Sequence, residues 1–284
     1  MKGNKMSTKE LIKPAGLFVL FLICSVLIFV LGSPYYSIFP TNKSGLYKIS
    51  LSIIFLTATL LLYHNERLKK YWQVSYTFFV ASFANWLLGT ELFRLPGSSP
   101  DTVQGMAVDK ISQLLAIVPA IIVLTLIVRV TLGSIYLKKG KLRLGLIIGL
   151  TTFIVFSVLG ILQGMGHNIG FATIGSWAPW LLIFSLSNGL LEELWFRGIF
   201  LKRFEALLGS KASLLLTSIV FAAAHVGATY ISSEITMFLV DVFVLGLAFG
   251  YVMQKTDSLW ASVLFHAGVD LWYIIGTGIA ATQQ

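Results

Sequence analysis

The sequence predicts an all-α polytopic membrane protein with about nine transmembrane helices and a cytoplasmic N-terminus. First, 56% of the 284 residues are hydrophobic and only 12% are charged, whereas a soluble domain carries about 25% charged residues. Second, the apolar residues form long runs, each close to the roughly 20 residues that a spanning helix needs. Third, most Lys and Arg residues fall in alternate connecting segments, which indicates a defined orientation.

Nine apolar runs follow one another along the chain, and eight is the alternative count of spans. The runs cover residues 14–32, 46–63, 71–93, 111–132, 143–162, 175–199, 212–231, 235–254 and 257–278. Between the third and fourth runs, residues 94–110 (RLPGSSPDTVQGMAVDK) are rich in Gly, Pro and Ser. Such a composition is typical of an exposed connector, which is how we interpret this segment.

The basic residues predict the orientation. With the N-terminus inside, sixteen of the 21 Lys and Arg residues fall in cytoplasmic segments, as the positive-inside rule expects. Lys43, Lys48, Arg94 and Lys110 fall outside, and an odd number of spans places the C-terminus outside. The net charge of +9 is thereby explained by membrane topology, so we expect no nucleic-acid partner. The membrane lipids are the expected surroundings.

The parts of the chain before and after the basic segment 138–143 differ in the composition of their spans. Residues 1–140 contain four spans of mostly aliphatic and aromatic residues and no readable motif, whereas residues 141–284 place polar residues inside spans at helical spacing. No internal repeat is visible, which argues against a transporter built from repeated halves. A single cysteine, Cys24, excludes an intramolecular disulfide framework and any metal site built from several cysteines.

The stretch NGLLEELWFRG places three ionisable residues, Glu192, Glu193 and Arg197, inside the sixth run. Ionisable residues within a membrane span are costly, so they usually face the protein interior and mark function. Glu193 and Arg197 are four residues apart with the acid first, the favourable order for an ion pair on one helix face. Glu192 points elsewhere, on the face that carries Asn188. We expect a structural role for the pair and a chemical role for Glu192.

Two later spans carry histidines. FAAAHVG places Phe221 and His225 one turn apart, and FHAGVDL places His266 and Asp270 on one helix face. An Asp beside a His can orient the ring and fix its tautomer. A glutamate, two histidines and an aspartate on neighbouring spans form an acid–base set that can activate water and stabilise an oxyanion. Taken singly, each of these residues also has a purely structural reading.

The order E-E-x-x-x-R, F-x-x-x-H and H-x-x-x-N/D resembles the CPBP family of intramembrane proteases, which includes the CAAX prenyl endopeptidases. In this chain the motifs are Glu192-Glu193-LWF-Arg197, Phe221-AAA-His225 and His266-AGV-Asp270, within residues 175–275. The resemblance implies a helical, multi-pass membrane hydrolase that cleaves peptide bonds near the cytoplasmic face. Its substrate would be a peptide or protein, lipidated or itself transmembrane, and the expected location is a prokaryotic plasma membrane.

The resemblance also assigns roles. Glu192 and His225 would activate water, and His266 with residue 270 would stabilise the oxyanion, while Glu193, Arg197 and Phe221 would support them. Residue 270 is Asp, and an ionised Asp cannot donate a hydrogen bond. Either Asp270 is protonated or it only orients His266.

Three alternatives remain open. Glu192, His225, His266 and Asp270 form a His/carboxylate set that would also suit catalytic zinc, although no H-E-x-x-H helix is present; we favour a metal-free, cofactor-free site. The chain could instead be a non-catalytic scaffold or bacteriocin-immunity-type protein that retains the site. A proton or ion transporter is the third reading.

Overall fold

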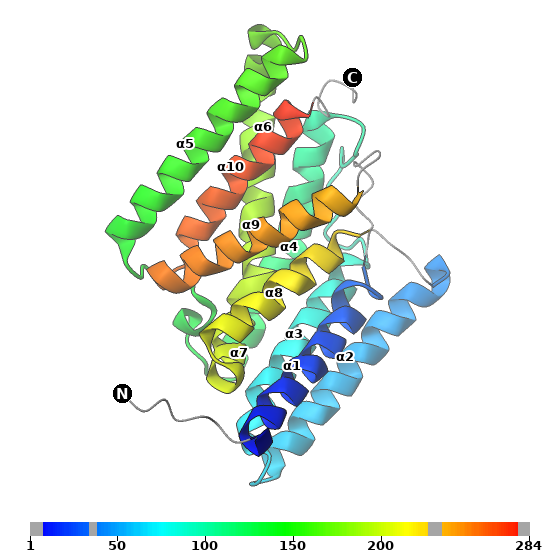
Figure 1. The fold of residues 1–284 in the computed structure, drawn as a ribbon. Coiled ribbons are helices and arrows are strands. Elements are labelled where there is room, and N and C mark those ends of the chain that lie inside the picture. Colours follow the sequence, from blue (N-terminus) through cyan, green and yellow to red (C-terminus); the bar gives the residue numbers. More distant parts are fainter. Residues whose placement is uncertain (1–7, 34–38, 227–234, 278–284) are drawn as a thin grey trace, which may run out of the picture. The chain divides into compact units, whose positions relative to one another are not determined.

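The structure is a computed structural model that describes residues 8–33, 39–226 and 235–277. Every regular element within these ranges is a helix (Figure 1). Lys2 and Lys5, which contribute to the predicted orientation, lie outside the described residues. The chain divides into two compact units: residues 1–82 with 200–247, and residues 83–199 with 248–284.

Five helical segments in the described part of the chain are long and apolar enough to cross a membrane. They are Lys43–His64, Val103–Ile127, Leu142–Gly166, Phe171–Leu208 and Ile235–Thr256, and Lys13–Phe29 and Ser210–Ala224 are shorter apolar helices. An all-helical protein with several membrane spans is thereby confirmed. Each predicted apolar run contains a helix in its described part, and residues 227–231 and 278 of two runs lie outside the described residues. The count of nine spans and the cytoplasmic N-terminus stay predictions.

The first unit contains three long N-terminal helices and three later ones. Its elements are α1 (Thr8–Phe29), α2 (Thr41–His64), the 3₁₀ turn η1 (Lys69–Tyr71), most of α3 (Trp72–Leu88), α7 (Leu201–Leu208), α8 (Ser210–Ala224) and the first part of α9 (Ile235–Thr256). Helix α1 packs against α7 and α8. Segments about 180 residues apart in the sequence are thus neighbours in this unit.

Aromatic rings form the core of the first unit. Phe21 of α1 stacks on Phe204 of α7 with 5.0 Å between ring centroids, and Phe55 of α2 stacks on Phe78 of α3 at 5.4 Å. Phe78 in turn contacts Phe200 at 5.4 Å. Such ring pairs add specific contacts to the burial of apolar surface, so they fix how these helices meet.

The second unit contains the end of α3 and the remaining helices. Its elements are α4 (Val103–Ile127), the 3₁₀ turn η2 (Leu132–Ile135), α5 (Leu142–Gly166), α6 (Phe171–Glu192), the π-helical turn η3 (Glu193–Gly198), the end of α9 and α10 (Trp260–Gly276). Helix α10 packs against α5 and α6, and α4 packs against α6.

Helix α4 begins earlier than the sequence predicted. Thr102 caps it, and its hydroxyl accepts a hydrogen bond from the Gly105 N–H at 2.9 Å. A Thr cap of this kind starts a helix by satisfying one of its first free N–H groups. The prediction of an exposed connector over 94–110 is therefore wrong from residue 103 onward. Lys110, assigned to an outer loop, lies two turns inside a helix.

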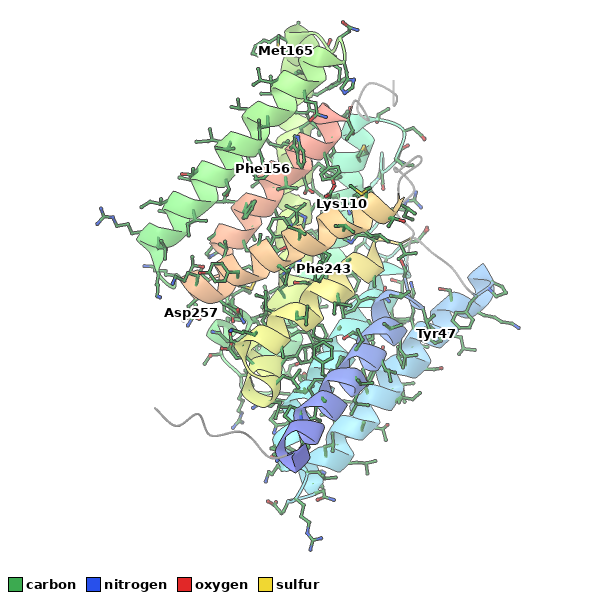
Figure 2. All side chains as sticks on the ribbon, in the orientation of Figure 1. Tyr47, Lys110, Phe156, Met165, Phe243 and Asp257 are labelled. Atoms are coloured by element: carbon green, nitrogen blue, oxygen red, sulfur yellow. The ribbon has the colours of Figure 1, made fainter. Side chains whose placement is uncertain are left out.

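Glycines bring α10 close to α5. A Cβ added to Gly160 would lie 2.8 Å from the Trp272 Cα, and one added to Gly268 would lie 2.7 Å from the Phe153 Cα. Phe156 of α5, labelled in Figure 2, also contacts the ring of a residue on α10, Trp272, with 5.6 Å between centroids. Small residues allow this approach between membrane helices, where packing replaces the hydrophobic effect as the main attraction.

The turn between α9 and α10 is tied to the segment that precedes α5. The Ser258 hydroxyl donates to the Lys138 carbonyl at 2.7 Å, and the Lys141 N–H donates to the Thr256 carbonyl at 2.7 Å. Lys138 and Asp257 form an ion pair. These bonds fix where α10 starts, and α10 carries His266 and Asp270.

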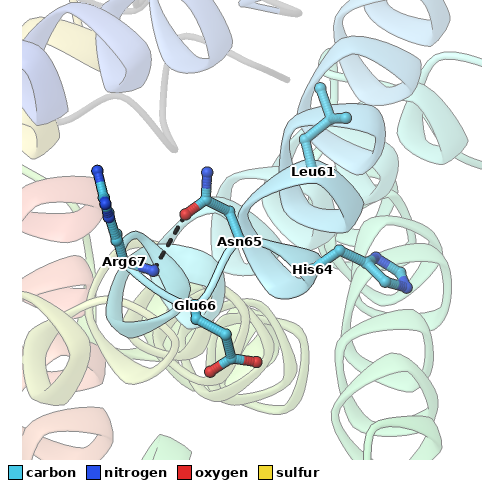
Figure 3. A pocket seen from close by; sticks show the side chains of 5 residues that line it. All are labelled: Leu61, His64, Asn65, Glu66 and Arg67. Atoms are coloured by element: carbon cyan, nitrogen blue, oxygen red, sulfur yellow. Dashed lines mark hydrogen bonds between the residues drawn. The ribbon is translucent and has the colours of Figure 1, made fainter.

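A surface depression of about 560 Å³ lies at the C-terminal end of α2 in the first unit. It is lined by Leu61 and His64 of the last turn of α2 and by residues 65–67, which follow the helix (Figure 3). The Asn65 side chain accepts hydrogen bonds from the N–H groups of Arg67 and Leu68, so it shapes the turn itself. None of the residues predicted for the site lines this depression.

Candidate active site

The backbone hydrogen bonding of helix α6 changes from α-helical to π-helical at the predicted site. The Ile199 N–H donates to the Leu194 carbonyl, five residues earlier, at 3.1 Å. The turn Glu193–Gly198 is therefore π-helical, and all six of its residues are buried. Turns of this kind inside α-helices are frequent at functional sites. The sequence spacing predicted an ordinary α-helix here and gave no sign of the wider turn.

Glu193 and Arg197 form the centre of a buried polar network. Arg197 Nη1 lies 2.5 Å from Glu193 Oε1, and both side chains are 0% exposed. The Ser262 hydroxyl donates to Glu193 Oε2 at 2.5 Å. The Arg197 guanidinium also lies 5.4 Å from the centroid of the Phe249 ring, where a cation is favourable. A buried charge needs such partners, and these contacts hold the Glu193 carboxylate in a fixed position.

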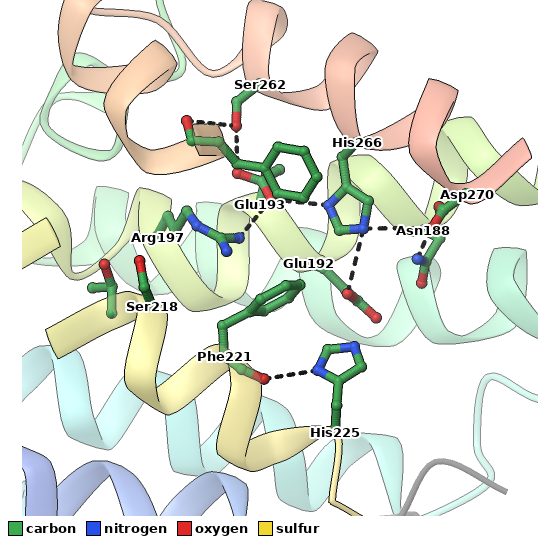
Figure 4. A network of polar contacts seen from close by, with 12 residues as sticks. Asn188, Glu192, Glu193, Arg197, Ser218, Phe221, His225, Ser262, His266 and Asp270 are labelled. Carbon is green, nitrogen blue, oxygen red and sulfur yellow. Dashed lines mark hydrogen bonds and ion pairs between the residues drawn. The ribbon is translucent and has the colours of Figure 1, made fainter. Parts of the chain in front are cut away.

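His266 is oriented by the same carboxylate. Its Nδ1 lies 2.9 Å from Glu193 Oε1 (Figure 4). Its ring stacks on Phe249 with 4.7 Å between centroids. An ionised carboxylate only accepts hydrogen bonds, so Nδ1 carries the proton. The other ring nitrogen, Nε2, is thereby turned towards Glu192 and Asp270.

Three titratable groups meet at Nε2 of His266. Glu192 Oε2 lies 3.7 Å from this nitrogen and Asp270 Oδ1 lies 3.5 Å from it. A bare lone pair on Nε2 would be repelled by two ionised carboxylates. At least one proton therefore resides on Nε2 or on one of the two carboxyl groups. Proton transfer between them is what an acid–base site requires.

Glu192 also faces a cation from another helix. Lys110 Nζ of α4 lies 3.9 Å from Glu192 Oε1, and the two side chains are 12% and 8% exposed. Lys110 Nζ donates to Gln113 Oε1 at 3.2 Å and lies 5.9 Å from the Phe184 ring centroid. Sequence reasoning missed this residue because residues 94–110 read as a loop. The Thr cap at 102 was the signal that could have extended the helix over Lys110.

Asp270 accepts a second contact that sequence spacing did not reveal. The Asn188 amide nitrogen donates to Asp270 Oδ2 at 3.0 Å, across from α6 to α10. Gly189, the next residue of α6, lets α10 come this close: an added Cβ would lie 2.9 Å from the Val263 carbonyl oxygen. Glycine at 189 is thus part of how the site is built.

His225 and Phe221 belong to the first unit, where His225 ends α8. His225 Nδ1 lies 2.7 Å from the Phe221 carbonyl oxygen, and the two rings meet edge to face with 4.6 Å between centroids. The carbonyl can only accept, so Nδ1 carries a proton, and in the neutral ring the lone pair is then on Nε2. The structure thus brings Glu192, His266 and Asp270 together in the second unit and orients His225 within the first.

The network of Glu193, Arg197 and His266 lies in a segment that matches a known protein family. Residues 174–272 match a family model described as type II CAAX prenyl endopeptidase Rce1-like. This segment is Rce1-like. The resemblance to the CPBP family is thereby confirmed over about a third of the chain, and the Rce1-like segment contains all the predicted site residues. Lys110 lies outside it. No curated protein and no solved structure matches the chain.

The zinc alternative requires a group of side chains that could hold a metal ion. Within residues 8–33, 39–226 and 235–277, no group of three or more His, Cys, Asp or Glu side chains is arranged to hold a metal ion. Lys110 Nζ also places a positive charge 3.9 Å from Glu192, which disfavours a second cation there. The zinc alternative is thus left to experiment.

We expect Gly189→Ala to loosen the junction of α6 and α10. The new Cβ would meet the Val263 carbonyl oxygen at 2.9 Å, and overpacking of this kind destabilises a protein by about 1–3 kcal/mol. The detergent-solubilised variant should melt at a lower temperature than the parent. Gly175→Ala is the matched control, because Gly175 lies in the same helix and an added Cβ meets nothing within 4 Å. Equal melting temperatures for the two variants would contradict this account.

Proposed function

We propose that the protein is an intramembrane endopeptidase that hydrolyses a peptide bond with a water molecule activated by Glu192 and His225. The Rce1-like segment supports a CAAX-type protease at the level of the family. The orientation of His266 is the observation that supports an acid–base mechanism in this segment. Its Nδ1 is held by the Glu193–Arg197 pair, so its Nε2 meets Glu192 and Asp270 in a buried site.

In this mechanism Glu192 takes a proton from water as the water oxygen attacks the substrate carbonyl carbon. His225, with its lone pair on Nε2, shares that water. The tetrahedral intermediate carries a negative oxygen, and a protonated His266 Nε2 donates a hydrogen bond to it. Glu192 then delivers the proton to the departing nitrogen as the C–N bond breaks. The new carboxylic acid gives its own proton to the released amine, so the products are a carboxylate and an ammonium group. Each proton is returned, so the enzyme ends as it began.

Asp270 acts in this scheme as an acceptor that orients His266. Two contacts support the role: His266 Nε2 lies 3.5 Å from one oxygen, and the Asn188 amide donates to the other. An acceptor that holds the imidazolium form of His266 also helps to keep the donor in place. Of the two roles left open by the sequence, this is the one we adopt.

The substrate class we propose is a peptide or protein segment presented at the membrane, lipidated or transmembrane. The chain would lie in a prokaryotic plasma membrane with nine spans and an inner N-terminus, and would cut near the cytoplasmic face. Residues 141–284 would form the protease core, with residues 1–140 as additional helices. Hydrolysis of a prenylated peptide ending in a CAAX sequence by purified protein in detergent is the direct test. A folded wild-type protein that cleaves neither this peptide nor a transmembrane peptide would favour a scaffold or immunity role.

The proposed topology predicts which positions are reached from outside the cell. In a Cys24-free background, cysteines at positions 68 and 140 should be shielded from an impermeant thiol reagent in intact cells, and cysteines at 98 and 282 should react. Permeabilised cells provide the control for reactivity. If position 282 reacts only after permeabilisation, the number of spans is even and the proposed count of nine is wrong.

The metal-free form of the mechanism predicts that chelators leave activity intact and that Asp270→Asn retains activity within about tenfold of the parent. Asn keeps an oxygen acceptor and adds an N–H donor at nearly the same size, so His266 stays oriented. With zinc bound, the same change would replace an anionic ligand by a weak neutral one. Stoichiometric zinc in active protein, lost with activity in Asp270→Asn, would overturn the metal-free mechanism.

A further inference from the structure

Asn188 has a buried oxygen that the proposed mechanism does not use. The residue is 6% exposed, and its Nδ2 donates to Asp270 Oδ2 at 3.0 Å. The partner fixes which end of the amide is which, because a carboxylate accepts and the amide nitrogen is the end that donates. The Asn188 oxygen therefore points away from Asp270, as Figure 4 shows.

No residue in the described ranges donates a hydrogen bond to Asn188 Oδ1, and the atom is buried. A buried acceptor without a donor is unfavourable, and native proteins rarely keep one without a reason. A bound molecule with an N–H or O–H group would satisfy this oxygen. The observation therefore indicates a binding role for Asn188 and specifies the chemistry of the group that it receives, which is a hydrogen-bond donor.

The position of Asn188 indicates which molecule would supply the hydrogen-bond donor to its oxygen. Asn188 lies one turn before Glu192 on the same face of α6, and it is bonded to the carboxylate that meets His266. A group bound at Oδ1 would therefore lie on the same face of α6 as Glu192, the carboxylate proposed to activate water. A peptide substrate carries one backbone N–H per residue besides the one at the scissile bond, and these are its regular donors.

We propose that Asn188 binds a backbone N–H of the substrate through Oδ1, at a residue adjacent to the scissile bond, and so positions the carbonyl for attack. The inference rests on the proposed peptidase function and adds to it a residue that touches substrate. It also explains why an amide is useful here: its nitrogen is held by Asp270, and its oxygen is left pointing in a fixed direction. Peptides lacking that N–H should be poor substrates.

The test is a set of ester-substituted probes. The parent probe is a prenylated peptide ending in a CAAX sequence, and each analogue replaces one non-scissile backbone N–H by oxygen. In the wild-type enzyme, one analogue should lose about tenfold in kcat/KM, as expected for one hydrogen bond. In Asn188→Leu, the parent probe should lose about tenfold and that same analogue should lose nothing more. A lost structural contact would not produce this dependence on a single atom of the substrate.

Ser185→Ala is the control variant. Ser185 is buried on the same helix, three residues before Asn188, and its hydroxyl donates to the Leu182 carbonyl of its own helix at 3.3 Å. Its response to each ester probe should match that of the wild type. If Asn188→Leu does not fold, the wild-type series decides alone: equal kcat/KM for all ester analogues and the parent overturns the proposal. An ester loss that is the same in Asn188→Leu as in the wild type overturns it as well.

The two proposals fail in different ways. Wild-type protein that does not hydrolyse the parent probe or a transmembrane peptide contradicts the peptidase function. Wild-type protein that hydrolyses the parent probe and is indifferent to every ester position leaves the peptidase function in place and contradicts only the role of Asn188.

Discussion

Glu192→Gln is expected to abolish peptide hydrolysis while the folded protein remains in the membrane. Gln keeps the size and the hydrogen-bonding shape of Glu but cannot take a proton from water. Loss of a general base lowers the rate by about 10²–10⁴-fold, so turnover of a prenylated CAAX peptide should fall by at least that range. Lys110 Nζ and His266 Nε2 lie 3.9 Å and 3.7 Å from the two different oxygens of Glu192. Gln keeps one of these oxygens at nearly the same size and leaves no buried negative charge behind, so folding should be preserved.

Glu205→Gln is the matched control for this experiment. Glu205 is an exposed carboxylate on α7 within the Rce1-like segment, so its replacement should leave turnover unchanged. Thermal melting in detergent would establish that both variants are folded. A well-folded Glu192→Gln protein with wild-type turnover would refute the general-base role.

Glu193→Gln is expected to impair folding rather than chemistry alone. Arg197 is 0% exposed and would lose the negative charge that lies 2.5 Å from its guanidinium. Breaking a buried ion pair by removing one partner costs about 3–5 kcal/mol, because the remaining charge is left uncompensated. We expect low expression, a lower melting temperature and loss of activity. Expression level and melting in detergent measure the first two effects.

The double variant Glu193→Gln/Arg197→Met separates the effect of an unpaired buried charge from the effect of the changed side chain. Removing both charges leaves no buried ion without a partner, and apolar replacements of a buried pair are often tolerated. The double variant should therefore melt at a higher temperature than Glu193→Gln. Its activity should remain low, since Gln holds His266 without a charge. If Glu193→Gln alone expresses and melts like the parent, the structural assignment of this pair is wrong.

Local spacing predicted the parts of the molecule that depend on neighbouring residues. Every predicted apolar run contains a helix, because a run of about 20 apolar residues has few other solutions in a bilayer. The contact between Glu193 and Arg197 follows from a separation of four residues. The contact between His266 and Asp270 follows in the same way.

Residue spacing could not predict the contacts between segments that are distant in the sequence. Lys110 and Glu192 are 82 residues apart in the sequence, and Ser262 and Glu193 are 69 apart. Only the packing of α4, α6 and α10 brings them together. The early start of α4 was missed for a local reason, since a Gly/Pro/Ser-rich composition outweighed the Thr102 cap. The π-helical turn has no local signature that we could identify.

The π-helical turn at Glu193–Gly198 has a consequence for helical phase. A bond that spans five residues holds one residue more per turn than an α-helical bond, and one residue corresponds to about 100° of rotation. Side chains after Gly198 are thus out of phase with those before Glu193. Phe200 and Phe204, which reach the aromatic core of the first unit, therefore cannot be placed by extending a helical wheel from Asn188 and Glu192. The turn also overlaps the E-E-x-x-x-R motif, so a one-residue deletion between Glu193 and Arg197 would remove the extra residue of the turn and the spacing of the buried ion pair together.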